Sequence, residues 1–341
     1  MGTVSNPSIS VIVPLFNKER YVLRAINSIL TQSFHDFEIV VVNDGSTDCG
    51  PEIVRQVHDP RIRLIDQGNA GVSAARNRGI WEAKSGLIGF LDADDEWLPQ
   101  FLETIVALTQ RYPKAGAYAT GYLLLKGGDG VCRRMTVKGG RHKCGCYFDL
   151  LRGGADVWTS SNIVVRRAVF DEVGAFRVGH KLAEDLDMWF RIGLRYPLAC
   201  SPRICALYHY YQPDSASHVA AASGVSPLYL SLLELERASD IDPNVRRKAL
   251  QYLSRQLIKG AEHILQVRAY DVARRRLDLY RAHYGVTMPY LRLRLLTALP
   301  RSILKSLIKL RLMLVHYVLA MTSSIRQVYL CRSSGGEGER L

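Results

Sequence analysis

Two clusters of acidic and polar residues in the first hundred positions have the composition of a metal and phosphate site. The first comprises residues 43–48 (Asn-Asp-Gly-Ser-Thr-Asp), and the second comprises Asp92, Asp94 and Asp95. Three carboxylates within four residues repel one another unless a cation or a hydrogen-bond donor neutralises them. Mg²⁺ and Mn²⁺ prefer oxygen ligands and commonly retain phosphate oxygens as further ligands. The second cluster therefore predicts a metal that binds a diphosphate, whereas an ordinary strand-to-helix turn remains the alternative for the first.

Short runs of Val and Ile precede both clusters and indicate the buried strands that position them. Such apolar runs suit parallel strands that are covered on both faces. The expected strands cover residues 9–13, 38–42, 62–65 and 87–91, and the expected helices cover residues 22–30, 71–84 and 99–111. This alternation predicts an α/β fold with a doubly wound, mostly parallel sheet. Ligands of such sheets bind at the carboxyl ends of the strands, where both clusters lie.

The loop after the first expected strand lacks the glycines of common nucleotide-binding motifs. Residues 13–18 read Val-Pro-Leu-Phe-Asn-Lys, so Gly-x-Gly-x-x-Gly does not follow this strand, and the chain contains no Walker-type motif. We therefore expect a metal and side chains, rather than a glycine-rich loop, to hold any nucleotide phosphates.

The seven cysteines are scattered and odd in number, which does not indicate a disulfide framework. Cys132, His142, Cys144 and Cys146 could be read as a zinc site. Structural zinc sites usually separate paired cysteines by two to four residues, and one residue separates Cys144 from Cys146. We expect a loop here rather than a zinc site.

Four motifs occur in order and include both clusters. They are residues 9–17 (Ile-Ser-Val-Ile-Val-Pro-Leu-Phe-Asn), 41–48 (Val-Val-Asn-Asp-Gly-Ser-Thr-Asp), 68–77 (Gly-Asn-Ala-Gly-Val-Ser-Ala-Ala-Arg-Asn) and 90–95 (Phe-Leu-Asp-Ala-Asp-Asp). Together they resemble family 2 glycosyltransferases, which are inverting enzymes with the GT-A (nucleotide-diphospho-sugar transferase) fold. The resemblance covers roughly residues 8–218 and implies the same fold and activity for this chain.

The resemblance implies a pocket for the nucleotide base at the first two motifs. Pro14, Phe16 and Asn17 would line this pocket, and Asp44 would accept a hydrogen bond from the base. A uracil N–H suits that acceptor, so a UDP-sugar is the first expected donor.

The next two motifs are implied to bind the sugar and the diphosphate. Asp92 would lie near the ribose or the sugar, and Asp94 would hold a Mn²⁺ or Mg²⁺ ion that bridges the diphosphate. Arg76 would lie near the pyrophosphate or the acidic residues, and its alternative is a solvated arginine on a helix surface.

Two later segments are implied to form the acceptor side and to supply a general base. Inversion is one in-line displacement at the anomeric carbon, so the acceptor hydroxyl must lose its proton as it attacks. The resemblance assigns the base to Asp185, with Glu184 and Asp187 as competitors. A helix with acidic residues in its first turn is the structural alternative. The residues expected in the donor-sugar or acceptor region are Trp158, Ser160, Ser161 and Glu184.

The chain departs from the family pattern near its last expected strand. Gln212 precedes Pro213 where many relatives carry a His, so a second metal or phosphate ligand is not carried over to this position. His209 and His218 lie nearby and are expected to be surface or packing residues. The Gln-x-x-Arg-Trp motif and the membrane spans of processive synthases do not occur, so we expect transfer of single sugars.

The positive charge of the chain is concentrated near its end. The net charge is +13, and residues 289–332 hold eight basic and no acidic residues. Arg301, Lys305 and Lys309 recur every four residues opposite an apolar side, which predicts a basic amphipathic helix at an anionic membrane surface. Packing of this helix on the catalytic domain is the alternative. No nucleic-acid motif accompanies the charge, and no nucleic-acid partner is expected.

The sequence thus predicts four parts: a catalytic domain (1–220), a helical region (221–288), a basic membrane-associating segment (289–332) and a disordered tail (333–341). No secretory signal or ordinary transmembrane helix is expected, so we expect a cytoplasmic protein on the inner face of the cell membrane. The expected function is metal-assisted transfer of one sugar from a nucleotide-sugar to a lipid-linked or glycan acceptor in bacterial surface-polysaccharide synthesis. A catalytically silent binding scaffold and a sugar nucleotidyltransferase are the alternatives.

Overall fold

The computed structural model describes seven stretches of the chain. They are residues 6–125, 132–137, 139–151, 158–180, 183–210, 227–266 and 270–298. The chain divides into two compact units, residues 1–255 and residues 256–341. The element at 212–217, most of the predicted basic segment and the predicted tail lie outside the described residues. The predicted domain boundaries therefore remain predictions.

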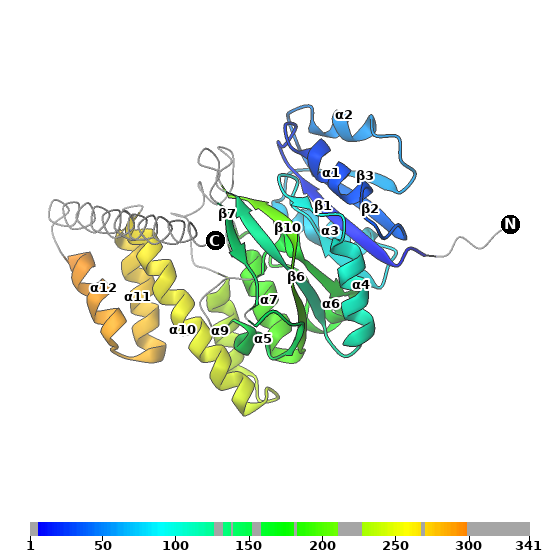
Figure 1. Cartoon of the computed structure of the whole chain (residues 1–341). Coiled ribbons are helices and arrows are strands. Elements are labelled where there is room, and N and C mark those ends of the chain that lie inside the picture. The colour runs from blue at the N-terminus through cyan, green and yellow to red at the C-terminus, as the bar shows by residue number, and fades with distance from the viewer. Residues whose placement is uncertain are drawn as a thin grey trace, which may run out of the picture. The chain divides into compact units, whose positions relative to one another are not determined.

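A ten-stranded sheet forms the centre of the first unit (Figure 1). The strands are β1 (Ile9–Leu15), β2 (Phe37–Asp44), β3 (Ile62–Gln67), β4 (Leu87–Phe90), β5 (Glu96–Trp97), β6 (Ala117–Leu125), β7 (Cys132–Met135), β8 (Lys143–Gly145), β9 (Ile163–Arg166) and β10 (Leu198–His209). The order of its main path is β3-β2-β1-β4-β9-β6-β10-β5, with β7 paired to β6 and β8 paired to β10.

The half of the sheet that carries the four motifs is parallel throughout. Strand β1 pairs with both β2 and β4 in parallel, and β2 pairs with β3 in the same direction. Strand β9 then lies antiparallel between β4 and β6. The four predicted strands are confirmed as β1 to β4, and their carboxyl ends meet at one edge of the sheet.

Helices cover both faces of this sheet, as the prediction of a doubly wound fold requires. The helices in the described part of the first unit are α1 (Val22–Leu30), α2 (Gly50–Arg55), α3 (Val72–Glu82), α4 (Phe101–Arg111), α5 (Tyr147–Leu150), α6 (Arg167–Val173), α7 (Glu184–Arg195), α9 (Leu228–Arg237), the first part of α10 (Pro243–Gln266) and the 3₁₀ turn η1 (Ser160–Asn162). Helices α1 and α4 pack on the face that bears Val11, Val13 and Val41. Helix α3 packs on the other face, against Val40 and Val42.

A glycine allows α3 to approach the centre of the sheet closely. A Cβ atom on Gly79 would lie 2.4 Å from a side-chain methyl of Ile12, which is far inside van der Waals contact. Any larger residue would push α3 away from β1. Helix α3 also carries Arg76, so this contact fixes the depth at which its guanidinium enters the site.

The second unit is helical in its described part, which comprises the end of α10 (Pro243–Gln266), α11 (Tyr270–Tyr284) and α12 (Met288–Ala298). Helices α11 and α12 pack through Tyr280 and Tyr290, whose ring centroids lie 6.1 Å apart in a stacked pair. Leu277 and Leu293 are buried beside them.

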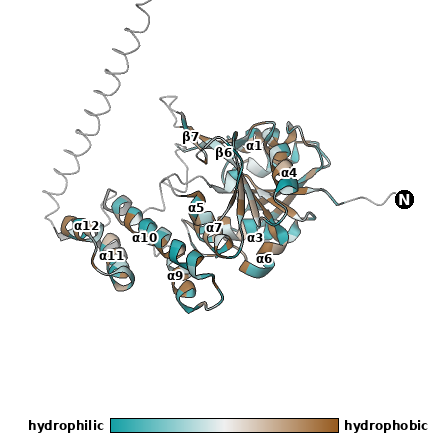
Figure 2. Cartoon of the chain, turned by 60° about the horizontal axis from the view of Figure 1, so that its bottom comes forward, coloured by the Kyte–Doolittle hydropathy of each residue, from teal (hydrophilic) through white to brown (hydrophobic). Residues whose placement is uncertain are grey.

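Apolar residues concentrate on the strands of the sheet, which are coloured brown in Figure 2. Every residue of β1 and β2 is buried. None of the helices within the described ranges combines the length and the apolar character needed to span a membrane.

Candidate active site

The residues predicted to line the base pocket lie at the ends of β1 and β2 and in the loops that follow them, at the carboxyl edge of the sheet. Pro14 is buried near the end of β1, and Phe16, one residue after the strand, leaves 46% of its surface exposed. The side chain of Asn17 accepts a hydrogen bond from the Thr47 backbone N–H at 2.8 Å, which ties the two loops together. The exposed ring of Phe16 is therefore available for stacking on a planar base.

Asp44 lies at the end of β2 and fixes the loop that precedes α3. Its carboxylate accepts hydrogen bonds from the Gln67 amide (2.7 Å) and from the backbone N–H groups of Ala70 (2.9 Å) and Gly71 (2.8 Å). Gly71 has a φ of 91°, a conformation that favours glycine. Asp44 thus has a structural task in addition to the base recognition that the resemblance implies, and its oxygens retain capacity for one further donor.

The acidic cluster (Asp92, Asp94 and Asp95) directs its three carboxylates toward three different sets of partners. Asp92 pairs with Arg76 at 2.8 Å, and Asp94 pairs with Lys18 at 2.8 Å. Asp95 is buried and accepts hydrogen bonds from the Ser161 hydroxyl and from the His209 backbone N–H. Burial, and then the neighbouring charges of Asp94 and Asp92, raise the pKa of Asp95 well above its ordinary value. Asp95 therefore fixes the shape of the cluster through its buried hydrogen bonds, whereas Asp92 and Asp94 form its ion pairs.

Asp94 is the member of the cluster that best fits a metal ligand. Its carboxylate is 17% exposed and already attracts the ammonium group of Lys18, so the position favours a cation. No group of three or more His, Cys, Asp or Glu side chains within the described stretches is arranged to hold a metal by itself. Mg²⁺ commonly binds through one or two carboxylates together with phosphate oxygens and water. A site built on Asp94 and a donor diphosphate matches that pattern.

Arg76 is a buried cation between the cluster and helix α7. It is 3% exposed, its Nη2 donates to Asp92 Oδ1 at 2.8 Å, and its Nη1 donates to Glu184 Oε1 at 2.9 Å. Burial by itself would lower the pKa of the guanidinium, but Asp92 and Glu184 more than offset this and raise its pKa above the ordinary value. The alternative of a solvated surface arginine is therefore wrong. Arg76 lies beside the acidic residues, as the resemblance implies.

Asp185 lies in the first turn of α7, next to the residue that Arg76 binds. Its Oδ1 accepts the backbone N–H of Leu186 at 2.7 Å. Burial of the carboxyl group, followed by the charge of Glu184, raises the pKa of Asp185 to about 7, although Arg76 and the Leu186 N–H act in the opposite direction. A carboxylate with a pKa near neutrality is well suited to accept a proton from a sugar hydroxyl.

The segment 158–162 lies against the acidic cluster. The hydroxyl of Ser161 accepts the backbone N–H of Asp92 and donates to Asp95, while its carbonyl accepts the Trp97 indole N–H at 2.7 Å. Ser161 therefore holds the cluster together. Trp158 and Ser160 are also buried, and their indole N–H and hydroxyl have no hydrogen-bond partner within the described part of the chain. Their contact with a bound sugar remains a prediction.

The sequence did not reveal several residues that the structure places around the site. Lys18 pairs with Asp94, and Phe176 covers the Arg76 guanidinium with its ring centroid 5.4 Å away. Asn77 donates to and accepts from the backbone of Phe176, at 2.8 Å in both cases. Lys18 directly follows the motif at 9–17, and Asn77 ends the motif at 68–77, so both could have been predicted as site residues from the sequence. No sequence pattern identifies Phe176 as a site residue.

The cluster, the buried arginine and the parallel half-sheet all lie in the region that matches a known family. Residues 10–174 match the model of "Glycosyl transferase family 2". Among curated proteins, the glycosyltransferase GlyA of Streptococcus pneumoniae is 47% identical over 100 residues, which is 28% of this chain and 14% of GlyA. WcaA of Escherichia coli, a glycosyl transferase named for colanic acid biosynthesis, is 36% identical over 123 residues, or 35% of this chain and 44% of WcaA. The chain thus spans less than half the length of either relative.

Solved structures share the fold over most of the chain at low sequence identity. Residues 1–349 of Staphylococcus aureus TarS, in complex with UDP-GlcNAc, match with a TM-score of 0.61 at 20% identity, over 80% of this chain and 89% of that one. The mannosyltransferase PcManGT of Pyrobaculum calidifontis, in complex with GDP-Man and Mn²⁺, matches with a TM-score of 0.58 at 19% identity, over 97% and 87%. Residues 10–174 therefore match glycosyl transferase family 2, and the chain has the GT-A fold of these solved structures.

Proposed function

We propose that the protein is a metal-dependent, inverting glycosyltransferase that moves a single sugar from a nucleotide-diphosphate donor to a lipid-linked or glycan acceptor. The observation that carries the proposal is the double ion pair of Arg76, which joins Asp92 to Glu184. This pairing puts the acidic cluster and the first turn of α7 on two sides of one guanidinium. A donor bound at the cluster would therefore lie next to Asp185, the candidate base.

The donor and acceptor classes follow from the site and from the relatives. An acceptor oxygen on Asp44 suits a uracil N–H, and the TarS structure contains UDP-GlcNAc, so a UDP-sugar is the first candidate. PcManGT contains GDP-Man and Mn²⁺, which supports a nucleotide-sugar with a divalent ion as the general class. The name of WcaA supports an acceptor used in polysaccharide synthesis.

In the proposed reaction, the residues of the chain orient the two substrates and remove one proton. The carboxylate of Asp185 takes the proton of the acceptor hydroxyl while that oxygen attacks the anomeric carbon from the face opposite the departing diphosphate. Arg76 holds Asp92 and Glu184 in place and keeps Asp185 more acidic than burial alone would leave it. Asp94 would hold the metal ion, which, when bound, stabilises the negative charge that builds on the diphosphate.

A donor screen tests this function directly. Melting temperatures would be measured with UDP-, GDP- and TDP-sugars in the presence of Mn²⁺ or Mg²⁺, because a ligand that binds the native state raises the melting temperature. Ligands that stabilise the protein would then enter hydrolysis and transfer assays, in which we expect turnover of a UDP-sugar. Binding without turnover of any donor would favour the silent scaffold. Release of pyrophosphate from a nucleoside triphosphate and a sugar phosphate would favour a nucleotidyltransferase.

The substitution Asp94→Asn is expected to remove most of the metal dependence of turnover. The amide keeps the size of the side chain but loses the charge that attracts the divalent ion, so kcat/KM should fall by about 100-fold or more, with weaker activation by Mn²⁺. Steady-state rates during a Mn²⁺ titration measure the effect. Asp36→Asn is a matched control, because Asp36 lies just before the amino end of β2, at the opposite edge of the sheet. Wild-type metal activation in Asp94→Asn would contradict the assignment.

We also propose that the basic end of the chain binds an anionic membrane surface from the cytoplasmic side. The sequence supplies the charge, and the described residues of α12 supply exposed apolar surface. Met288, Leu291 and Leu295 lie on one side of this helix and are 78%, 41% and 68% exposed, whereas its opposite side is buried. Exposed apolar side chains beside basic residues are typical of helices that lie in a membrane interface.

Substituting Gln for Arg301, Lys305 and Lys309 together in the full chain is expected to weaken binding to anionic vesicles by at least about tenfold, since each basic residue near such a surface contributes about 1 kcal/mol. Co-sedimentation with vesicles that contain phosphatidylglycerol measures the effect. A control with the same loss of charge replaces the exposed residues Lys84, Arg111 and Lys114 by Gln. Equal binding of the two triple variants would contradict the proposal and favour packing of the segment on the protein.

A further inference from the structure

Asp187 is a fully buried carboxylate two residues after the candidate base. It is 0% exposed, whereas Asp185 keeps part of its surface accessible. Positions i and i+2 of a helix face nearly opposite directions, so the two side chains leave α7 on different sides. Asp187 therefore cannot reach a sugar hydroxyl, and it is excluded as the general base.

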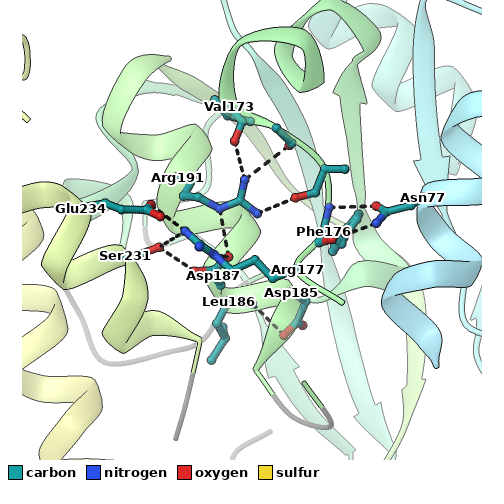
Figure 3. A network of polar contacts seen from close by, with 12 residues as sticks. Asn77, Val173, Phe176, Arg177, Asp185, Leu186, Asp187, Arg191, Ser231 and Glu234 are labelled. Carbon is teal, nitrogen blue, oxygen red and sulfur yellow. Dashed lines mark hydrogen bonds and ion pairs between the residues drawn. The ribbon is translucent and has the colours of Figure 1, made fainter. Parts of the chain in front are cut away.

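Three polar side chains donate hydrogen bonds to the carboxylate of Asp187 (Figure 3). Its Oδ2 accepts hydrogen bonds from Arg177 Nε at 3.0 Å and Arg191 Nε at 2.9 Å, and its Oδ1 accepts the Ser231 hydroxyl at 2.6 Å. Arg177 also pairs with Glu234 on α9 at 2.6 Å. The two arginines thus balance the charges of Asp187 and Glu234, and the network links α7 to α9.

Arg191 and Asn77 hold the segment 173–177 from two sides. The Arg191 guanidinium donates to the carbonyl groups of Val173 at 2.5 Å and Ala175 at 2.9 Å. On the other side, Asn77 of α3 makes its two hydrogen bonds to the backbone of Phe176. This segment therefore connects the helix that carries Arg76 to the helix that carries Asp185.

The first turn of α7 has little local support. It begins after Ala183, whose φ of 65° lies in the left-handed region that non-glycine residues rarely adopt. Ala183 at the N-cap has no side chain that can bond the N–H groups of this turn, and the one side-chain hydrogen bond described there is local, from the Leu186 N–H to Asp185 Oδ1. A turn without an N-cap side chain that follows an unfavourable backbone conformation depends largely on tertiary contacts for its position.

We propose that Asp187 is a positioning residue, which holds the first turn of α7, and with it Asp185, against the donor site through Arg177, Arg191 and Ser231. This inference rests on the proposed function. Asp187 does not touch a substrate, and its loss should misplace the base without changing how the donor nucleotide binds. The expected signature is a lower kcat with an unchanged KM for the donor.

Two variants test the proposal in the full chain. Asp187→Asn removes the charge that both arginines share and is expected to lower kcat by at least about tenfold, with the donor KM within about twofold of wild type. Ser231→Ala removes one hydrogen bond from the α9 side and should lower kcat by about threefold. Because both variants act through one network, the double variant should lose no more than Asp187→Asn alone. Ser239→Ala, on the exposed turn after α9, is the matched control.

Amide hydrogen exchange gives a readout that needs neither a known donor nor activity. In Ser231→Ala, which is mild enough to fold, the hydrogen-bonded amides of Leu186 and Asp187 should exchange at least about fivefold faster than in wild type, with the strands unchanged. Unchanged exchange in this turn, or a folded Asp187→Asn that keeps its wild-type kcat, would overturn the positioning role. A wild-type protein that turns over no donor would instead overturn the proposed function. The exchange result would still show whether the network around Asp187 holds the first turn of α7.

Discussion

Replacing Asp185 by Asn is expected to reduce sugar transfer by about 1,000-fold at pH 8, because the amide cannot accept the proton of the acceptor hydroxyl. The proposed donor site lies on the other side of Arg76, so the KM for the nucleotide-sugar should stay within a few-fold of wild type. Steady-state transfer rates at saturating donor, together with titration calorimetry of the nucleotide, measure the two effects. Asp171→Asn, at an exposed position on α6, is the matched control.

The pH dependence of the wild-type enzyme should report the same group. The pKa of Asp185 is raised to about 7, first by burial and then by the charge of Glu184. A general base acts in its deprotonated form, so kcat/KM should rise about tenfold per pH unit below about pH 7 and level off above it. A rising limb centred near pH 4 would contradict the assignment of the base.

The same shift predicts that Asp185 destabilises the folded protein at the pH where it works. Its folded pKa of about 7 lies above the ordinary value of 3.8, so the folded state binds the proton more tightly than the unfolded state does. The favourable contribution of the protonated group is present below about pH 4 and is lost as the pH rises through about 7. Asp185→Asn should therefore raise the melting temperature at pH 8 and leave it nearly unchanged at pH 4.

The sequence predicted the parallel half of the sheet because its strands are continuous apolar runs. Residues 9–13, 38–42 and 87–91 consist largely of Val, Ile, Leu and Phe, and a strand buried on both faces requires such a run. The antiparallel insertion of β9 between β4 and β6 was not predicted. A four-residue strand carries too little pattern to define either its direction or its neighbours.

The candidate site was predictable where its residues lie at or near strand ends, as Asp44 at the end of β2 and Asp92 shortly after β4 do. Contacts between residues that lie far apart in the chain were not predictable. Arg76 meets Glu184 across 108 positions, and Asn77 meets Phe176 across 99. Periodicity describes which face of a helix is apolar, but it does not say which buried charges will meet once two helices pack. The anchoring of α7 therefore became visible only in the structure.

Replacing Arg76 by Met is expected to impair both stability and catalysis, because it leaves two carboxylates without their shared cation. Removing one partner of a buried ion pair costs about 3–5 kcal/mol, since the remaining charge stays desolvated. Asp92 is 28% exposed and can recover some hydration, so the lower end of that range is expected. Unfolding in urea at pH 8 measures the loss, which should be smaller at pH 5, where carboxylates begin to take up protons.

The catalytic effect of Arg76→Met should appear as a change in the pH profile. Arg76 lowers the pKa of Asp185, so its loss should raise that pKa and move the rising limb of kcat/KM to higher pH. Arg76→Lys keeps the charge but lacks the planar fork that reaches Asp92 and Glu184 together, so it should give an intermediate shift.

Arg78→Met is the matched control for Arg76→Met. Arg78 lies two residues later on α3 and is 45% exposed, and its one ion pair among the described residues is with Glu82 on the same helix. If the rising limb of kcat/KM keeps its wild-type position in a folded Arg76→Met protein, Arg76 does not set the pKa of Asp185. The link that Arg76 makes between the acidic cluster and α7 would then be structural alone.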